Sequence, residues 1–317
     1  MTGPSRYPFT STPDGWYHVA ASGEIEPGQV LSLHFFGRDL VAYRTEAGEA
    51  VVLDAHCPHL GAHLGHGGQV VGESIRCPFH AWRFGADGRC VEVPYQQRGR
   101  LPEVGLKCWP VHECAGLVLV WHSDDGHAPD WRMPEIPEYT ADDWQGYLTH
   151  SWTVRMHVQE LCENVPDTAH FEVIHGLPEP PGADAEVEGP LYRQFTTLPN
   201  PDGSRWVVAR QECWGLGLVW LRTDVEPLTT FLTATTPIDD ETCLLKQFVL
   251  IRDPEPGANG ELGAAARAGV EMVFAQTEFD VPIWENKIYR QKPPLVEDDG
   301  PLPILRRWAQ QFYPEHR

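Results

Sequence analysis

The sequence predicts an α+β protein, in which an all-β domain is followed by a domain with one antiparallel sheet and helices on it. Three observations lead to this prediction. The chain has 317 residues, which is longer than one average domain. Short runs rich in Val, Leu, Phe and Tyr fill residues 16–122, and strand-like runs mixed with helical patterns fill the rest. We therefore expect two separate hydrophobic cores.

The all-β domain is expected at residues 16–122, after an N-terminal extension of residues 1–15. Its apolar runs, such as QVLSLHFFG and CAGLVLVWHSDDG, alternate with segments rich in Gly, Pro and Asp. The triplets EAG and ADG are typical of tight turns between strands. The polar, Pro-rich segment 122–139 marks the boundary with the second domain, expected at residues 123–317.

The second domain opens with YLTHSWTVRMHVQELCENVPDTAHFEVIHG, which predicts a strand and then a helical pattern that ends at Gly176. Pro166 has no amide hydrogen to donate, so it predicts a kink, or a helix start, just before Asp167. Further strand-like runs follow, among them RWVVARQECW and TCLLKQFVLIR. Helical patterns close the chain at about 263–292 and 301–313. The Pro- and Gly-rich stretch 176–190 predicts a mobile loop or lid.

Charge excludes two classes of partner. The net charge of -21 opposes binding to nucleic acid and to anionic membrane surfaces, because phosphate contacts need clustered Lys and Arg. Residues 76–107 differ from the rest, with six basic and three acidic side chains. This segment could steer an acidic redox partner, although scattered solvated charges explain it equally well.

The N-terminal segment lacks the basic start and apolar run of a secretion signal, and no apolar stretch approaches the roughly 18 residues of a membrane span. We therefore expect a cytoplasmic protein with reduced cysteines. Six of the eight cysteines are expected to be small buried apolar side chains: Cys90, Cys108, Cys114, Cys162, Cys213 and Cys243.

The stretch CPHLGAHLGHGGQVVGESIRCPFH carries a metal-ligand pattern. It places Cys57 and His59 before a 17-residue spacer, and Cys77 and His80 after it. A zinc ribbon usually pairs ligands of one type, such as Cys-x-x-Cys. Here each half donates one Cys and one His, which suits a 2Fe-2S cluster with two thiolates on one iron and two imidazoles on the other.

A second pattern, ENVPDTAHFEVIHG, places Asn164, Asp167 and His170 at i, i+3 and i+6, on one side of a helix. His175 lies about 140° round an ideal helix from His170, so the two imidazoles can share a metal only if the helix ends between them. Gly176 is well placed to end it. Two His with one carboxylate form the facial triad of non-haem Fe(II) oxygenases, whereas satisfied helix histidines are the alternative.

The motif at residues 57–80 resembles the Rieske motif, with CPFHAW close to the family's usual Cys-Pro-Tyr/Phe-His-Gly-Trp. Ala81 replaces the common Gly. Respiratory-chain Rieske proteins carry an additional disulfide-linked cysteine in each loop, where Ala62 and Phe79 stand in this chain. The sequence therefore resembles the low-potential Rieske type of ferredoxins and oxygenases.

Together, the two motifs resemble the Rieske non-haem iron oxygenases over nearly the whole chain. This resemblance implies a Rieske domain followed by a helix-grip (START-like) catalytic domain that holds a mononuclear Fe(II) and uses O2 as co-substrate. It also implies a carboxylate ligand on a late helix, where QTEFDVPIWENKIYRQ offers Asp280. Glu278 and Glu285 are rivals that the sequence leaves open.

The resemblance further implies a head-to-tail homotrimer that receives electrons from a ferredoxin or a flavin/iron-sulfur reductase. In such a trimer Asp167 would bridge a cluster histidine of one subunit, His80 or His59, to the iron ligand His170 of its neighbour. Asn164 belongs to the same motif and is expected to act with Asp167 at the catalytic centre.

Two stretches, VVLDAHCPHLGAHLGHGGQVVGESIRCPFHAWRFGADGRC and DVPIWENK, resemble the steroid-acting branch of 3-ketosteroid 9α-hydroxylases and cholesterol 7-desaturases. The expected function is a monooxygenase that hydroxylates or desaturates a hydrophobic polycyclic, steroid-like substrate. Oxidative cyclisation or another C-H functionalisation in natural-product tailoring is one alternative. A non-catalytic iron-sulfur electron-transfer protein is another.

Overall fold

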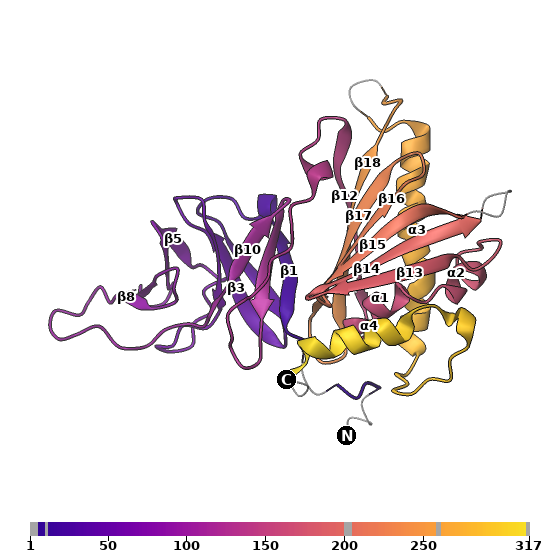
Figure 1. Cartoon of the computed structure of the whole chain (residues 1–317). Coiled ribbons are helices and arrows are strands. Elements are labelled where there is room, and N and C mark those ends of the chain that lie inside the picture. Colours follow the sequence, from indigo (N-terminus) through magenta and orange to yellow (C-terminus); the bar gives the residue numbers. More distant parts are fainter. Residues whose placement is uncertain (1–5, 10–11, 200–204, 258–260, 315–317) are drawn as a thin grey trace. The chain divides into compact units, whose positions relative to one another are not determined.

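The computed structural model describes residues 6–9, 12–199, 205–257 and 261–314. The chain divides into two compact units, which Figure 1 shows in indigo to magenta and in magenta to yellow. They comprise Trp16–His122 with Gly126–Pro134, and Met1–Gly15, Ser123–Asp125 and Glu135–Arg317. Among the described residues, no helix is both long and apolar enough to cross a membrane.

The first unit contains three small sheets with strand orders β1-β11-β10, β2-β3-β4-β9 and β5-β6-β7-β8. Hairpin pairings such as β2 with β3 and β6 with β7 are antiparallel, which confirms the expected all-β architecture. The elements are β1 Gly15–Ala21, η1 Ser22–Glu24, β2 Val30–Phe35, β3 Arg38–Arg44, β4 Ala50–Asp54, β5 Gln69–Val71, β6 Ser74–Arg76, β7 Arg83–Phe84, β8 Cys90–Glu92, β9 Cys108–Trp109, β10 Val111–Cys114 and β11 Leu117–His122.

The core of this unit extends under the metal motif. Cys57 and Cys77 are buried in one hydrophobic cluster with Leu64, Trp82 and Phe84. Cys57 lies in the connection between β4 and β5, and Cys77 in the connection between β6 and β7. Both connections are therefore anchored by apolar packing at the point where each cysteine projects.

The second unit is built on one seven-stranded antiparallel sheet with the order β12-β18-β17-β16-β15-β14-β13. The elements are η2 Pro137–Tyr139, β12 Trp144–Val154, α1 Gln159–Asn164, α2 Ala169–Val173, β13 Gly182–Glu188, β14 Leu191–Pro199, β15 Arg205–Trp214, β16 Leu218–Thr223, β17 Thr229–Pro237, β18 Cys243–Arg252, α3 Ala264–Asn286, η4 Glu297–Asp299, α4 Leu302–Ala309 and η5 Gln310–Phe312. This layout of an antiparallel sheet with few helices confirms the predicted α+β class.

Helix α3 is fixed to the sheet by apolar contacts. Ala266 and Val270 on α3 form a buried cluster with Val249 and Ile251 on β18. Helix α1 contacts α4, and Figure 1 shows α4 in yellow beside α1. The packing of α3 matters for function because its C-terminal half carries Asp280.

The helix predicted to run to Gly176 is broken in the structure. Helix α1 ends at Asn164 and α2 begins at Ala169, and Pro166 stands between them. Proline has no amide hydrogen and its ring clashes with the preceding turn, so an interruption here has a clear cause. The break agrees with the kink or helix start that Pro166 predicts, and Asn164, Asp167 and His170 consequently do not share one side of a single helix.

The break is held by the segment that precedes α4. Gly300 has a φ of +79°, and a Cβ built on it would lie 2.0 Å from the Pro166 carbonyl oxygen. The Thr168 hydroxyl donates to the Asp298 carbonyl at 3.3 Å. Only glycine can approach the break this closely in a left-handed conformation.

Three other expectations need correction. Within the proposed loop 176–190, Gly182–Glu188 forms β13 and pairs with β14 along its whole length, so this part is strand and not a lid. The helix predicted at 263–292 ends at Asn286. Cys108 is exposed, whereas the other five cysteines expected to be buried are buried.

Candidate metal centres

The two loops that carry the Cys and His pairs share one backbone pattern. Gly61 donates its N–H to the Cys57 carbonyl at 2.9 Å, and Ala81 donates to the Cys77 carbonyl at 3.1 Å. Each cysteine amide in turn donates to the carbonyl five residues ahead, at 2.9 and 2.8 Å. Gly61 has a φ of +76° and Ala81 a φ of +58°. Ala81 thus adopts the left-handed turn that glycine makes in the first loop, at a cost of about 1–2 kcal/mol.

These loops bring four candidate ligands together. Cys57 and Cys77 are each 2% exposed, and burial raises the pKa of the Cys57 thiol, with the neighbouring Cys77 adding to the shift. The rings of His59 and His80 lie 4.8 Å apart. His59 Nδ1 is buried and has no hydrogen-bond partner among the described residues. An unpaired buried polar atom costs about 1–3 kcal/mol, so a ring nitrogen left in this state fits a metal ligand.

Two aromatic side chains support His59. The Trp82 ring stacks on the His59 ring, with centroids 4.5 Å apart and planes 7° apart. Trp82 Nε1 donates to the Tyr95 hydroxyl at 2.7 Å. Neither role follows from the motif alone, since it predicts a Trp after His80 but not which ring it covers.

A further group in this unit lies at metal-ligand distances, namely Asp39, His56 and His63. Three of its four ring nitrogens already have protein partners. His56 Nδ1 lies 3.2 Å from the Gly61 carbonyl and Nε2 lies 3.1 Å from the Asp39 carboxylate, and His63 Nδ1 accepts from the Gly65 amide at 3.0 Å. The carboxylate raises the pKa of His56, so this group is explained as an ion pair.

In the second unit the structure brings His170, His175 and Asp280 together. One ligand atom from each lies within 4.8 Å of the others, and the two imidazole rings are 5.0 Å apart. His170 lies in α2, His175 just beyond its end, and Asp280 in α3. The three residues are named the His–His–Asp triad below.

Hydrogen bonds orient the first member of the triad. His170 Nδ1 donates to the Asp167 carbonyl at 2.5 Å, which leaves the lone pair on Nε2. Asn164 Nδ2 lies 3.2 Å from His170 Nε2 and donates to Asp280 Oδ2 at 3.1 Å. The Asn164 amide therefore holds together two ligand atoms that come from different helices.

His175 reaches the site because α2 ends before it. The helix stops at Val173, and Gly176 has a φ of +70°, as expected for a residue that ends a helix. His175 Nε2 lies 3.5 Å from Asp280 Oδ2. Its Nδ1 is buried and has no partner among the described residues.

The rival carboxylates occupy other faces of α3. Asp280 is 7% exposed and shares its buried face with Thr277 and Trp284, three residues before it and four after. Glu278 is exposed, as expected two positions earlier on a helix, and Glu285 is half-buried but outside the group of ligand atoms. Two imidazoles and a carboxylate fit a non-haem Fe(II) site.

Asp167 lies beside the triad with a half-exposed carboxylate. Its side chain is 46% exposed and accepts from the His170 amide at 3.3 Å. Burial raises the pKa of Asp167, but the hydrogen bond and charge of His170 outweigh it, so the net pKa is lowered. The carboxylate is therefore ionised at neutral pH and free on one side.

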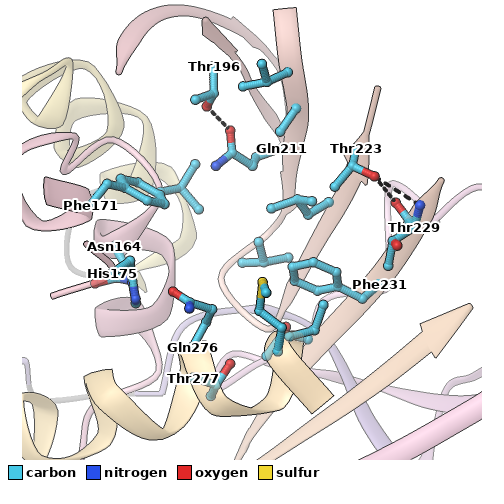
Figure 2. A pocket seen from close by; sticks show the side chains of 18 of the residues that line it. Asn164, Phe171, His175, Thr196, Gln211, Thr223, Thr229, Phe231, Gln276 and Thr277 are labelled. Carbon is cyan, nitrogen blue, oxygen red and sulfur yellow. Dashed lines mark hydrogen bonds between the residues drawn. The ribbon is translucent and has the colours of Figure 1, made fainter. Parts of the chain in front are cut away.

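A cavity of about 430 Å³ opens onto the triad. It lies between α1, α2 and α3 on one side and the sheet face from β14 to β18 on the other, and its walls are mainly apolar. Figure 2 shows Phe171 and Phe231 across the cavity, with Asn164 and His175 at one end. Volumes of about 300–1,000 Å³ are typical of sites for small organic molecules.

Comparisons with known proteins agree with this geometry. The Rieske [2Fe-2S] domain family matches residues 15–110, and the 3-Ketosteroid 9alpha-hydroxylase C-terminal domain family matches residues 120–313. Cholesterol 7-desaturase nvd of Xenopus laevis is 32% identical over 95% of this chain and 72% of its own length. The probable 3-ketosteroid-9-alpha-monooxygenase oxygenase component of Rhodococcus rhodochrous is 32% identical over 94% of this chain and 79% of its own.

Solved structures show the same fold at lower identity. NdmA of Pseudomonas putida CBB5 superposes with a TM-score of 0.74 at 18% identity, covering 93% of this chain and 89% of NdmA. Dicamba monooxygenase bound to dicamba gives a TM-score of 0.66 at 17% identity, covering 94% and 96%.

The match to the Rieske [2Fe-2S] domain family indicates that this chain holds a 2Fe-2S cluster. One of the solved structures with the same fold is dicamba monooxygenase with non-haem iron and dicamba. The curated relatives of this chain are oxygenase components, that is, oxidoreductases, which contradicts the alternative of a non-catalytic electron-transfer protein. Taken with the two family matches, these relatives show that the chain belongs to the Rieske non-haem iron oxygenases, as the oxygenase component of such a system.

Proposed function

We propose that this oxygenase component hydroxylates or desaturates an apolar, polycyclic, steroid-like molecule held in the cavity beside the His–His–Asp triad. The observation that carries the proposal is that the triad borders an apolar cavity of about 430 Å³. The names of the relatives, a cholesterol desaturase and a ketosteroid monooxygenase, support the steroid-like class.

We assign the 2Fe-2S cluster to Cys57, His59, Cys77 and His80, and the mononuclear iron to the triad. When bound, these groups supply electrons and O2 activation, respectively. The chain's own residues position them. Asn164 fixes the distance between α1 and α3 at the site through its bond to Asp280, and the Asp167 carbonyl fixes the protonated nitrogen of His170.

The cavity walls have two functions. Apolar side chains bind the hydrocarbon skeleton and exclude water, so that the reactive centre meets substrate and not solvent. They also leave few polar groups to orient the substrate, so regiochemistry depends on shape and on these few groups.

Asp167 is proposed to connect the two metal centres between subunits. We expect a homotrimer in which the free side of the Asp167 carboxylate accepts a ring N–H from His80 or His59 of a neighbouring subunit. Its ionised state and 46% exposure support this role. The relatives are named oxygenase components, which implies a separate electron donor, and we propose a ferredoxin or a flavin/iron-sulfur reductase. We expect the protein in the cytoplasm, where thiolate ligands stay reduced.

The test is a metal count combined with a turnover assay. Anaerobically reconstituted protein should contain three irons and two acid-labile sulfides per chain, and it should consume O2 in the presence of a surrogate reductase and a steroid. Mass spectrometry should find a product heavier by one oxygen or lighter by two hydrogens. A count of two irons per chain, or an O2 uptake that is the same with and without the steroid, would overturn the proposal.

A further inference from the structure

We propose that Gln211 and Gln247 select the substrate by binding two oxygen functions at separate ends of the cavity. The inference rests on the proposed function, because it concerns the same cavity. It narrows the substrate to an elongated apolar skeleton with a hydroxyl that donates to Gln247 and a carbonyl that accepts from Gln211.

Gln247 leaves a hydrogen-bond acceptor unpaired in the cavity wall. It lies on β18, is 2% exposed, and its Nε2 donates to Thr233 Oγ1 at 3.2 Å and to Thr277 Oγ1 at 2.8 Å. Its Oε1 is buried and has no partner among the described residues. Leaving such an acceptor unmatched costs about 1–3 kcal/mol, so the site favours a ligand that brings a donor.

The place of Gln247 relative to the iron follows from Thr277. Thr277 precedes Asp280 by three residues on α3, so the two side chains lie on one helix face about one turn apart. A substrate hydroxyl bound to Gln247 would therefore lie close to the triad. Figure 2 shows Thr277 and Gln276 at the same end of the cavity as Asn164 and His175.

Gln211 offers the opposite chemistry. It lies on β15, is 3% exposed, and its Oε1 accepts from Thr196 Oγ1 at 2.6 Å. Thr196 thus engages the oxygen of the amide, and Figure 2 shows the amide of Gln211 directed into the cavity. An amide N–H₂ fixed in this way can donate to a carbonyl or ether oxygen.

The other polar groups of the wall are less suited to this role. Thr223 Oγ1 donates to the Thr229 carbonyl at 3.2 Å and accepts from its amide at 3.0 Å. Gln276 is only half-buried, so water can satisfy it. The Gln247 and Gln211 amides are therefore the groups of the buried wall best placed to bind a substrate oxygen.

The separation of the two amides suits an elongated molecule. Strands β16 and β17 lie between β15 and β18 in the sheet order, which puts the two strands that carry the amides about 14 Å apart across a flat sheet and closer across a curved one. A fused polycyclic skeleton with one oxygen at each end would reach both, whereas a small monofunctional molecule would reach only one.

The experiment measures binding without turnover, on reduced holoenzyme under anaerobic conditions and without a reductase. The probes are testosterone, which has a ketone and a hydroxyl at opposite ends, and two analogues, one lacking the hydroxyl and one lacking the ketone. Isothermal titration calorimetry gives each Kd. We expect testosterone to bind at least about 10-fold tighter than either analogue.

Near-isosteric substitutions assign each oxygen to its amide. Gln247→Met should raise the Kd for testosterone about 10-fold and leave the Kd for the analogue without the hydroxyl unchanged. Gln211→Met should likewise raise the Kd for testosterone about 10-fold and leave the Kd for the analogue without the ketone unchanged. Thr235→Val is the matched control, because Thr235 is a fully buried polar residue of β17 that does not line the cavity and whose hydroxyl has no partner among the described residues. It should leave all three Kd values unchanged.

Equal affinities for the three probes, no binding of any probe, or equal losses in all three variants would overturn the inference. Each result can occur while the oxygenase itself is active on another substrate, because O2 uptake and product formation are measured separately. Conversely, the predicted pattern of affinities can appear in a protein that fails the turnover test.

Discussion

The two proposed metal centres differ in how much of the chain is needed to build them. The four cluster residues lie within residues 57–80, on the loop that connects β4 to β5 and the loop that connects β6 to β7. The triad combines His170 and His175 with Asp280, which lies more than 100 positions later in the sequence. The first centre is therefore fixed by local structure, and the second depends on how a distant helix packs.

Hydrogen bonding shows the same contrast. Each cluster loop closes on itself through two backbone bonds of 2.8–3.1 Å, so its cysteine is positioned by its nearest neighbours. Asp280 is positioned by the packing of Ala266 and Val270 on β18 and by one side-chain bond from Asn164. A change far from the triad can therefore disturb it, whereas the cluster loops should resist changes that lie far from them in the sequence.

The largest effect is expected from Asp280→Asn, which should remove the mononuclear iron and leave the cluster in place. Losing the carboxylate removes the only anionic ligand of the triad, so turnover should fall by more than about 100-fold. The measured number of irons should fall from three to two per chain, while the visible spectrum of the cluster should stay unchanged.

Glu278→Gln is the matched control, because Glu278 is an exposed carboxylate on the same helix. It should keep three irons and normal turnover. If Asp280→Asn keeps the third iron, or if the cluster is lost with it, the two centres are not assembled independently and the contrast between them is wrong.

How far the sequence predicts each centre follows from the same contrast. Cys57 and Cys77 could be assigned from spacing, because their loops are short-range structures. His175 could be predicted to join His170, since Gly176 ends the helix. Asp280 could be separated from Glu278 only by the face of α3 that packs inward, which depends on contacts with residues far away in sequence.

The remaining errors have physical causes too. Pro166 predicts an interruption of the helix, but not that Gly300 packs against the Pro166 carbonyl there, because Gly300 lies more than 130 residues away in the sequence. The polar wall residues Gln211 and Gln247 were not predicted either. Their strands alternate as expected, but which face meets the helices follows only from the assembled sheet.

The second prediction tests the proposed link between the centres. Asp167→Asn should keep three irons, because His170 Nδ1 donates to the backbone carbonyl of residue 167. It should lower turnover about 10- to 100-fold, because the neutral amide is a weaker acceptor than the carboxylate for the ring N–H of His80 or His59 from the neighbouring subunit. Single-turnover measurements should show slower oxidation of the cluster after O2 is added.

Glu172→Gln is a suitable control, since Glu172 is an exposed carboxylate on α2. It should turn over at the normal rate. Unchanged cluster oxidation in Asp167→Asn would mean that the two centres exchange electrons by another route.

A third prediction compares the two units under acid. Burial lowers the pKa of His157 in the second unit to about 3 and that of His122 in the first unit to about 4. In the folded protein both histidines stay neutral at pH 5 to 6.5, whereas in the unfolded chain each takes up a proton below pH 6.5. The unfolded state is therefore favoured, and stability is lost, as the pH falls through 6.5. As the pH falls from 6.5 to 5, each of these two histidines should lower the free energy of unfolding by about 2 kcal/mol.

His157→Phe should remove that loss from the second unit only. Phe9 stacks on His157 at 4.3 Å, so an aromatic replacement keeps the packing. The difference in unfolding free energy between pH 7.5 and pH 5.0 should shrink by about 2 kcal/mol relative to the parent protein. His150→Phe, at an exposed histidine of the same unit, should leave the difference unchanged, and an equal response of both variants would contradict the assignment.

The smallest effect is expected where the cluster site depends on a contact outside its own loops. Tyr95 accepts a hydrogen bond from Trp82, which stacks on His59. Tyr95→Phe removes that acceptor, so the Trp82 ring should be held less rigidly against His59 and water should reach the His59 ring more easily. Better solvation favours the more highly charged reduced cluster, and the reduction potential should rise by less than about 59 mV, the value of a tenfold change for one electron. Leu101→Ala, an exposed residue of the same loop, should not move the potential in a redox titration, and a shift of equal size in both variants would show that the loop acts through solvent and not through Trp82.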